Sequence, residues 1–419
     1  MKKLKEILLI FSLFCLIWIA SAISYSGFHG SDGSGYIYFS RDLEKGLKEC
    51  FQNHRILHIS ILSIFPEKEI IRIYGFIFSL ILIIAFYLVA KKLLNKEMQK
   101  FCIILLLTSP IFIVMSPTVY TEIPSLSLII LSLYSYIKRN FYFSGILLGI
   151  SVFFKEIALF MLGAMVIDII LNKRDHKIFI ALILGFLTVF APLFFAYFIF
   201  TEKIWFIDFF LRSNAIYSQK FSFVYDFILR KIAFLFLLGI SFVFVLNFKK
   251  LKLAIAKVPA VLKYYFIISL ICYFLFHAVS PRFSIFFLPI FFVIPLLIER
   301  KHTKFLFPLL FVQVVITIYT IHIFTQPFIA EKRALEFIVN NFSQSKVYGF
   351  SLSFWYELKN KGFEIAHNIS SANIVFVPVE KVNTKEFKVV KTVKIPCTLK
   401  FFRMLGCKEK EYAIALRKI

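Results

Sequence analysis

The sequence predicts an all-α polytopic membrane domain of about eleven transmembrane helices, followed by a small α/β domain. Of its 419 residues, 60% are hydrophobic and only 17% are charged, and the mean hydropathy is +0.82. So few polar residues could not cover the apolar surface of a soluble protein of this size. Long apolar stretches recur as far as residue 324 and are absent from the sequence after it.

Short polar segments separate the apolar stretches. The stretches cover residues 7–23, 70–90, 101–115, 124–137, 141–154, 157–171, 178–200, 231–247, 264–279, 283–297 and 305–324. Several are shorter than the ~20 residues that a perpendicular helix needs, so the pairs around Thr118, Lys155 and Pro281 could also be re-entrant. Ala20-Ser21-Ala22 resembles a signal-peptidase site, although the many later spans favour an uncleaved anchor.

Two domains are expected on this basis. Residues 1–325 form the transmembrane domain, with an interfacial first outer loop at 27–69. Residues 326–419 form a soluble α/β domain, because 331–341 has helical periodicity and the later apolar segments resemble strands. The predicted strands lie within 346–351, 372–379, 386–393 and 412–418.

The basic residues predict the orientation in the membrane. The formal net charge is +25, but lysines and arginines are spread through short loops, which argues against a nucleic-acid partner. Alternate loops differ in their lysine and arginine content, and the basic set includes the N-terminus. By the positive-inside rule, the N-terminus is cytoplasmic, the C-terminal domain lies outside, and the protein is a multi-pass protein of the plasma membrane.

Several ionisable residues fall on the predicted outer face. They are Asp32, Glu122, Lys155, Glu156 and Arg282. Each could simply extend from a helix end to water, but charged groups near the bilayer are costly unless they are paired or used. Their common placement indicates a site.

The first outer loop supplies further candidates. Asp32 is its first acidic residue and lies between glycines, so a catalytic base and a plain polar turn are both open interpretations. His54 and His58 are four residues apart and would share a helical face, with Arg55 beside them. They could bind zinc, bind a lipid-linked phosphate or pack at the interface; no third zinc ligand is apparent from the sequence.

Four segments carry a resemblance to a known family. They are SDGSGYIYFSRDL, SPTVYTEIPSLSL, GILLGISVFFKEIAL and HAVSPRFSIFFLPIFFVIP, beginning at residues 31, 116, 145 and 277. In this order the chain resembles the clan C (GT-C) membrane glycosyltransferases, and is similar to the protein O-mannosyltransferase and aminoarabinose transferase group. Many members have an Asp-Glu pair where this chain has Asp32-Gly33, so the role of base would rest on Asp32 alone.

The resemblance implies an inverting sugar transfer from a polyprenyl-phosphate donor to a hydroxyl acceptor, which could be a lipid, a glycan or a protein. Asp32 would be the base, and Glu122 would position the acceptor. Lys155 and Arg282, with His54, Arg55 and His58 as lesser candidates, would bind the donor phosphate. Some members use a divalent cation, so Asp32 and Glu122 are also candidate ligands for Mg²⁺ or Mn²⁺.

Other classes of protein are open at this point. A membrane transporter or a lipid-linked-sugar flippase would be expected to contain internal repeats and charges near the bilayer midplane, neither of which is evident in the sequence. An oligosaccharide polymerase or ligase would use similar donors but would add a block of sugars in each step.

Overall fold

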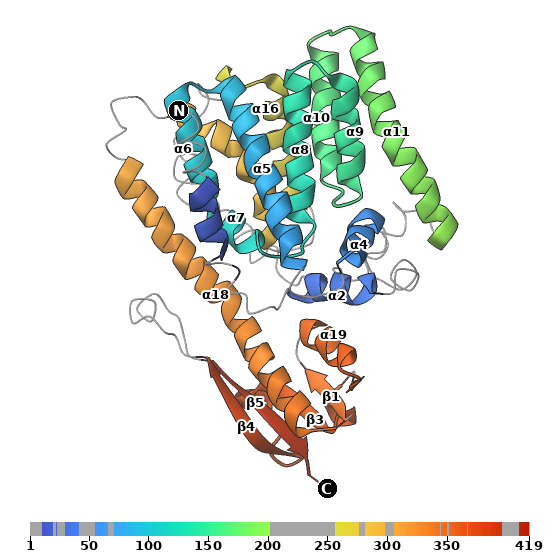
Figure 1. The fold of residues 1–419 in the computed structure, drawn as a ribbon, viewed down its shortest axis with the longest axis vertical. Helices are drawn as coiled ribbons and strands as arrows, with labels where there is room; N and C mark the ends of the chain where they lie inside the picture. Colours follow the sequence, from blue (N-terminus) through green and yellow to red (C-terminus); the bar gives the residue numbers. More distant parts are fainter. Residues whose placement is uncertain are drawn as a thin grey trace.

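The computed structural model describes residues 11–19, 22, 30–41, 55–65, 71–201, 256–275, 281–297, 306–343, 345–349, 352–366, 368–395 and 410–418 (Figure 1). Within these residues, a bundle of apolar helices is joined to a C-terminal region that contains a β-sheet. This confirms the expected mostly helical molecule with an α/β region at its C-terminal end. The predicted span at 231–247 lies outside the described residues, so the number of about eleven crossings stays a prediction.

The helices of the bundle follow the predicted apolar stretches closely. They are α5 (Ile71–Leu93), α6 (Lys96–Leu107), α7 (Pro110–Met115), α8 (Glu122–Ile137), α9 (Phe141–Val152), α10 (Ala158–Leu171), α11 (His176–Thr201), α16 (Ala260–Leu275), the 3₁₀ helix η2 (Pro281–Phe292) and α17 (Ile294–Leu297). Two helices in the described part of the chain contain segments long and apolar enough to cross a membrane, Ile73–Leu93 and His176–Ile199. Five other apolar helices of the bundle are shorter.

The predicted stretch at 101–115 is two helices, because the chain breaks between α6 and α7. The Thr108 hydroxyl donates to the Ile104 carbonyl at 2.7 Å at the end of α6. Pro110 then begins α7, where its missing N–H costs nothing. The start of α6 has a polar cap: the Asn95 side chain accepts a hydrogen bond from the Met98 amide.

Close contact between α9 and α11 depends on glycine. A Cβ added at Gly149 would lie 2.7 Å from the Phe186 carbonyl oxygen, and one at Gly145 would overlap the Leu182 carbonyl. The small-x-x-x-small spacing of Gly145 and Gly149 predicts such close packing, and the structure confirms it.

Two short helices cover one end of the bundle, close to where α8 begins and α9 ends (Figure 1). They are α2 (Gly30–Ser40) and α4 (Ile56–Ser63). Tyr36 and Ile37 of α2 and Ile59 of α4 are buried with Val119 and Phe154 in one apolar cluster. The first outer loop is therefore partly helical and packed onto the bundle.

The C-terminal region contains a mixed five-stranded sheet. Its elements are β1 (Lys346–Gly349), α19 (Leu352–Asn360), β2 (Glu364–Ile365), β3 (Ile374–Pro378), β4 (Phe387–Ile395) and β5 (Lys410–Arg417). The strand order is β2-β1-β3-β5-β4, with β1 parallel to β2 and β3 and with β5 antiparallel to β3 and β4. All four predicted strands are confirmed.

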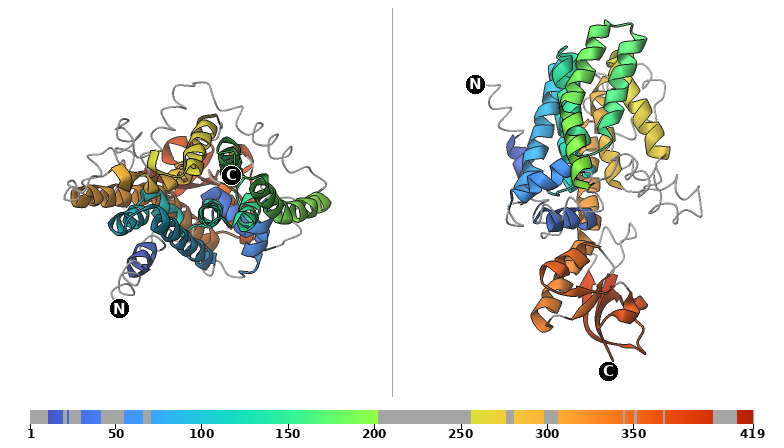
Figure 2. Two further views of the ribbon diagram at one scale, coloured as in Figure 1. Left: turned by 90° about the horizontal axis from the view of Figure 1, so that it is seen from above. Right: turned by 90° about the vertical axis from the view of Figure 1, so that its right-hand side faces the viewer.

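One long helix, α18 (Leu306–Asn341), connects the bundle to this region (Figure 2). Near its start, Gln313 Nε2 donates to Thr108 Oγ1 at 2.8 Å. Near its end, Ala334 and Ile338 are buried in the core beside the sheet. The predicted short helix at 331–341 is thus the last part of α18, which also runs through the expected domain boundary at 325/326.

Candidate active site

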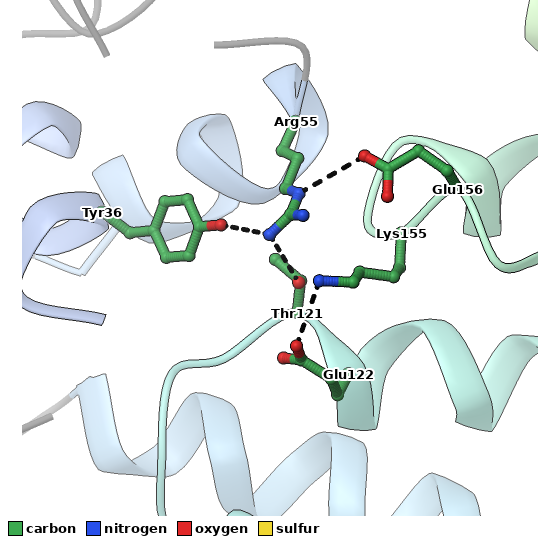
Figure 3. A network of polar contacts seen from close by, with 6 residues as sticks. All are labelled: Tyr36, Arg55, Thr121, Glu122, Lys155 and Glu156. Carbon is green, nitrogen blue, oxygen red and sulfur yellow. Dashed lines mark hydrogen bonds and ion pairs between the residues drawn. The ribbon is translucent and has the colours of Figure 1, made fainter. Parts of the chain in front are cut away.

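A cluster of charged side chains lies where α2, α4, the start of α8 and the turn between α9 and α10 meet (Figure 3). It contains Arg55, Glu122, Lys155 and Glu156. Four of the predicted site residues, Arg55, His58, Glu122 and Lys155, are brought together in this part of the molecule.

Lys155 and Glu122 form a buried ion pair. Lys155 Nζ lies 3.1 Å from Glu122 Oε1, and the two side chains are 4% and 1% exposed. Glu122 is the first residue of α8, where the helix dipole also favours a carboxylate. Burial removes the solvation of both groups, so each depends on its partner for remaining charged.

Serine contacts bring these two residues together. Ser125, in the first turn of α8, and Ser151, near the end of α9, have their hydroxyl oxygens 3.0 Å apart. Ser151 also donates to the Ser125 carbonyl at 3.0 Å. Beyond Ser151, the Lys155 amide donates to the Ser151 carbonyl at 2.9 Å, so the turn after α9 directs the lysine back toward α8.

Arg55 is the second buried cation. It lies immediately before α4 and is 4% exposed. Its guanidinium donates to the Tyr36 hydroxyl and, at 3.1 Å, to Thr121 Oγ1, and its Nε is 3.7 Å from a carboxylate oxygen of Glu156. Arg55 thereby connects α2 to the start of α8 and to the turn after α9.

His58 is buried beside this cluster in a neutral form. Its Nδ1 is 2.6 Å from the Tyr74 hydroxyl, and its ring meets the Tyr36 ring edge-on with 4.5 Å between centroids. Burial, with a smaller effect of the nearby Arg55 charge, lowers the pKa of His58 to about 3. At neutral pH it therefore adds no positive charge to the site.

The other predicted residues are located only in part. Asp32 lies in α2, one helical turn before Tyr36, and Arg282 lies in the first turn of η2. The side chains of both, and the whole of His54, lie outside the described residues. Their roles stay predictions.

Three neutral partners of the cluster are absent from the predicted site: Tyr36, Thr121 and Tyr74. The sequence contains a signal for two of these three residues, Tyr36 and Thr121. Tyr36 follows Asp32 by four residues, which is one helical turn, and Thr121 immediately precedes Glu122. Tyr74 carries no such signal, because only the packing of α4 on α5 brings it to His58.

The donor set does not favour a metal at Glu122. The Lys155 ammonium already contacts Glu122 Oε1 and balances the negative charge of this carboxylate. A metal cation would need that same negative charge for binding. Among the described residues, no group of three or more histidines, cysteines, aspartates and glutamates is arranged to hold a metal ion. Because the Asp32 side chain is outside that set, the Mg²⁺ or Mn²⁺ site with Asp32 stays a prediction.

Comparison with known proteins identifies relatives of this architecture. Residues 59–197 match the model of the dolichyl-phosphate-mannose-protein mannosyltransferase family. No curated protein sequence matches the chain. The crystal structure of ArnT from Cupriavidus metallidurans bound to undecaprenyl phosphate has the same fold, with a TM-score of 0.62 at 11% identity over 98% of each chain.

The apo-state structure of the same ArnT gives a TM-score of 0.61 at 11% identity, covering 99% of this chain and 98% of that chain. The matched family segment includes the second half of α4, Glu122 and Lys155, and the shared fold extends over the C-terminal region as well. These findings confirm the resemblance seen in the sequence: the chain shares the fold of ArnT and is similar to the protein O-mannosyltransferase and aminoarabinose transferase group of the clan C (GT-C) glycosyltransferases.

Proposed function

We propose that the chain is a glycosyltransferase that moves a sugar from a polyprenyl-phosphate donor to a hydroxyl acceptor on the outer side of the plasma membrane. The observation that carries the proposal is the pair of buried cations, Arg55 and Lys155, beside the helix that contains Asp32. A buried cation can stabilise the negative charge that a phosphate leaving group acquires. The ArnT relative binds undecaprenyl phosphate, which supports the same class of lipid for this chain.

The proposed reaction is a single displacement. Asp32 accepts the proton of the acceptor hydroxyl, whose oxygen attacks the anomeric carbon of the sugar. The bond from that carbon to the phosphate oxygen breaks, and the polyprenyl phosphate leaves with the bonding electrons. Inversion at the anomeric carbon follows, because attack and departure occur on opposite faces of the sugar ring.

In this proposal, Arg55 and Lys155 alone do not supply enough positive charge to bind a phosphate. The four described charges of the cluster balance, since two cations face Glu122 and Glu156. A bound phosphate therefore needs further positive charge, and Arg282 from the start of η2 supplies it. Glu122 keeps Lys155 charged and in place, and the lipid, glycan or protein acceptor approaches from the side of α2.

Sugar transfer from radiolabelled polyprenyl-phosphate mannose, glucose and aminoarabinose, catalysed by membranes that contain the protein, tests the proposal. Asp32→Asn should lower transfer by at least about a hundredfold, the usual contribution of a general base. The matched control is Asp175→Asn, because Asp175 is exposed in the turn between α10 and α11, far along the helices from Glu122.

Full transfer by Asp32→Asn would overturn the role of Asp32. The product separates the competing functions: a product longer by one sugar supports the proposal, and one longer by a block supports a polymerase or ligase. Movement of the donor across the membrane without transfer would identify a flippase.

A further inference from the structure

The C-terminal region touches the helix that carries Asp32. Figures 1 and 2 show α19 directly beside α2, on the side of α2 that faces away from the bundle. The contact joins two segments more than 300 positions apart in the sequence.

Tyr356 of α19 makes the closest part of this contact. A Cβ added at Gly35 would lie 3.1 Å from Cε2 of the Tyr356 ring, so the ring rests on the backbone of α2. The same ring packs against Tyr38 and Phe39, with centroid separations of 5.4 and 5.8 Å. The Lys359 ammonium lies 6.0 Å from the centre of the Tyr38 ring, at the outer limit of a cation–π contact.

The C-terminal region holds α19 firmly. Phe354 and Leu358, four residues apart, are fully buried in the core next to the sheet. The Trp355 indole donates to the Gly349 carbonyl at the end of β1, at 2.7 Å. Tyr356 is therefore presented to α2 from a helix whose other face is fixed.

α2 needs such support, because its own sequence favours a helix poorly. Its eleven residues, GSDGSGYIYFS, include three glycines and three serines. Glycine is the least favourable residue in a helix interior after proline, and a helix of this length is marginal alone. Contacts on both sides stabilise it: Tyr36 bonds to Arg55 on the bundle side, and Tyr356 covers Gly35 on the other.

We propose that α19 is a brace that keeps α2 helical and in place, and that Tyr356 is a positioning residue for Asp32. The inference rests on the proposed function for the role of Asp32, but the contact between α19 and α2 stands independently of it. The C-terminal region is on this account part of the transfer machinery, and the geometry of the base depends on it.

Hydrogen exchange of the full-length protein in nanodiscs, measured by mass spectrometry, tests the brace without reference to activity. Tyr356→Ala should speed exchange of the α2 amides by about tenfold, since two aromatic pairs are lost, and should leave α8 unchanged. Tyr356→Phe keeps the ring and its aromatic contacts, so its α2 amides should exchange more slowly than those of Tyr356→Ala. The control is Val389→Ala, an exposed position on β4 of the same region.

A second substitution tests whether Tyr356 acts by stabilising the helical conformation of α2. Gly35→Ala alone forces a methyl group against the Tyr356 ring and should speed exchange of α2. In the Tyr356→Ala background the same methyl group has room, and alanine should slow exchange because it favours the helix. Additive effects of the two changes would overturn the inference.

Transfer activity gives the second readout. Tyr356→Ala should lower kcat by about tenfold to a hundredfold with little change in the KM of the lipid donor, because the base is displaced while the phosphate-binding cations remain. Unchanged exchange of α2 would overturn the brace, and faster exchange with wild-type kcat would overturn the role of Tyr356 in positioning Asp32. Wild-type protein that transfers no sugar would count against the proposed function instead, and the exchange of α2 would still decide whether α19 holds it.

Discussion

The charge of Lys155 and that of Glu122 depend on each other, because both side chains are buried. Removing one partner of a buried ion pair costs about 3–5 kcal/mol, since the other charge is left without compensation. Lys155→Met should therefore lower the free energy of unfolding by roughly that amount. Thermal unfolding in detergent micelles measures the loss, and Lys177→Met, at an exposed position, is the control.

The double variant Glu122→Gln/Lys155→Met separates stability from function. It removes both charges, so it should recover most of the stability that Lys155→Met loses. Transfer should stay low in both variants, because the proposed phosphate site loses a cation. A double variant as unstable as Lys155→Met would show that the pair is not the source of the loss.

The lowered pKa of His58 predicts that the folded protein is less stable at acidic pH. Its pKa in the folded protein is about 3, below the usual value of 6.5, so between these values the unfolded chain binds the proton and the folded chain does not. Stability should thus fall as pH decreases from 6.5 toward 3, by up to about 1.4 kcal/mol per pH unit from this group. His58→Asn should flatten this dependence.

Unfolding at a series of pH values between 4 and 7 measures the effect of His58. His176→Asn, which changes a histidine with an 80% exposed side chain, is the control for the substitution itself. Equal slopes for wild type and His58→Asn would contradict a neutral, buried His58.

At the scale of elements, the contact of α9 with α11 predicts opposite effects of one substitution at two places. Gly149→Ala should destabilise the protein, because the new Cβ would lie 2.7 Å from the Phe186 carbonyl oxygen. Gly163→Ala should be neutral or stabilising by up to about 1 kcal/mol, since among the described residues its Cβ meets only Ile268, at 3.7 Å. Melting temperatures of the two variants give the comparison, and destabilisation by both would contradict it.

The elements themselves were largely predictable from the sequence. The ends of α8, α10 and α11 lie within a few residues of the predicted stretches, because apolar length and flanking polar residues determine them. The break between α6 and α7 was not predicted, although Pro110 is a signal for it. The length of α18 was missed because its polar second half was interpreted as a separate helix.

The site was predictable as a set of charges but not as a set of contacts. The positive-inside rule placed Glu122, Lys155 and Glu156 on one face, and the structure brings them together near Arg55. The rule carries no information about partners, so the bonds from Arg55 to Tyr36 and Thr121 were not foreseen. Such contacts depend on tertiary packing between segments far apart in the chain.

On the scale of the whole molecule, the two ends of the helix bundle differ in charge. The turn between α10 and α11, with Lys173 and Arg174, and the start of α11, with Lys177, lie at the end opposite α2 and the C-terminal region (Figure 1). Basic loops stay on the cytoplasmic side, so this turn should be cytoplasmic, and the sheet should lie outside. The orientation follows from charge alone and is independent of the proposed reaction.

Single cysteines at two exposed lysine positions test this orientation in intact cells. Lys385→Cys, before β4, should react with a membrane-impermeant maleimide added from outside, whereas Lys177→Cys should react only after the membrane is permeabilised. The native protein without either substitution corrects for labelling of its own cysteines, of which Cys102 is buried. If only Lys177→Cys is labelled in intact cells, the topology is the reverse of the predicted one. The proposed transfer would then take place on the cytoplasmic side, and the donor would have to be present there.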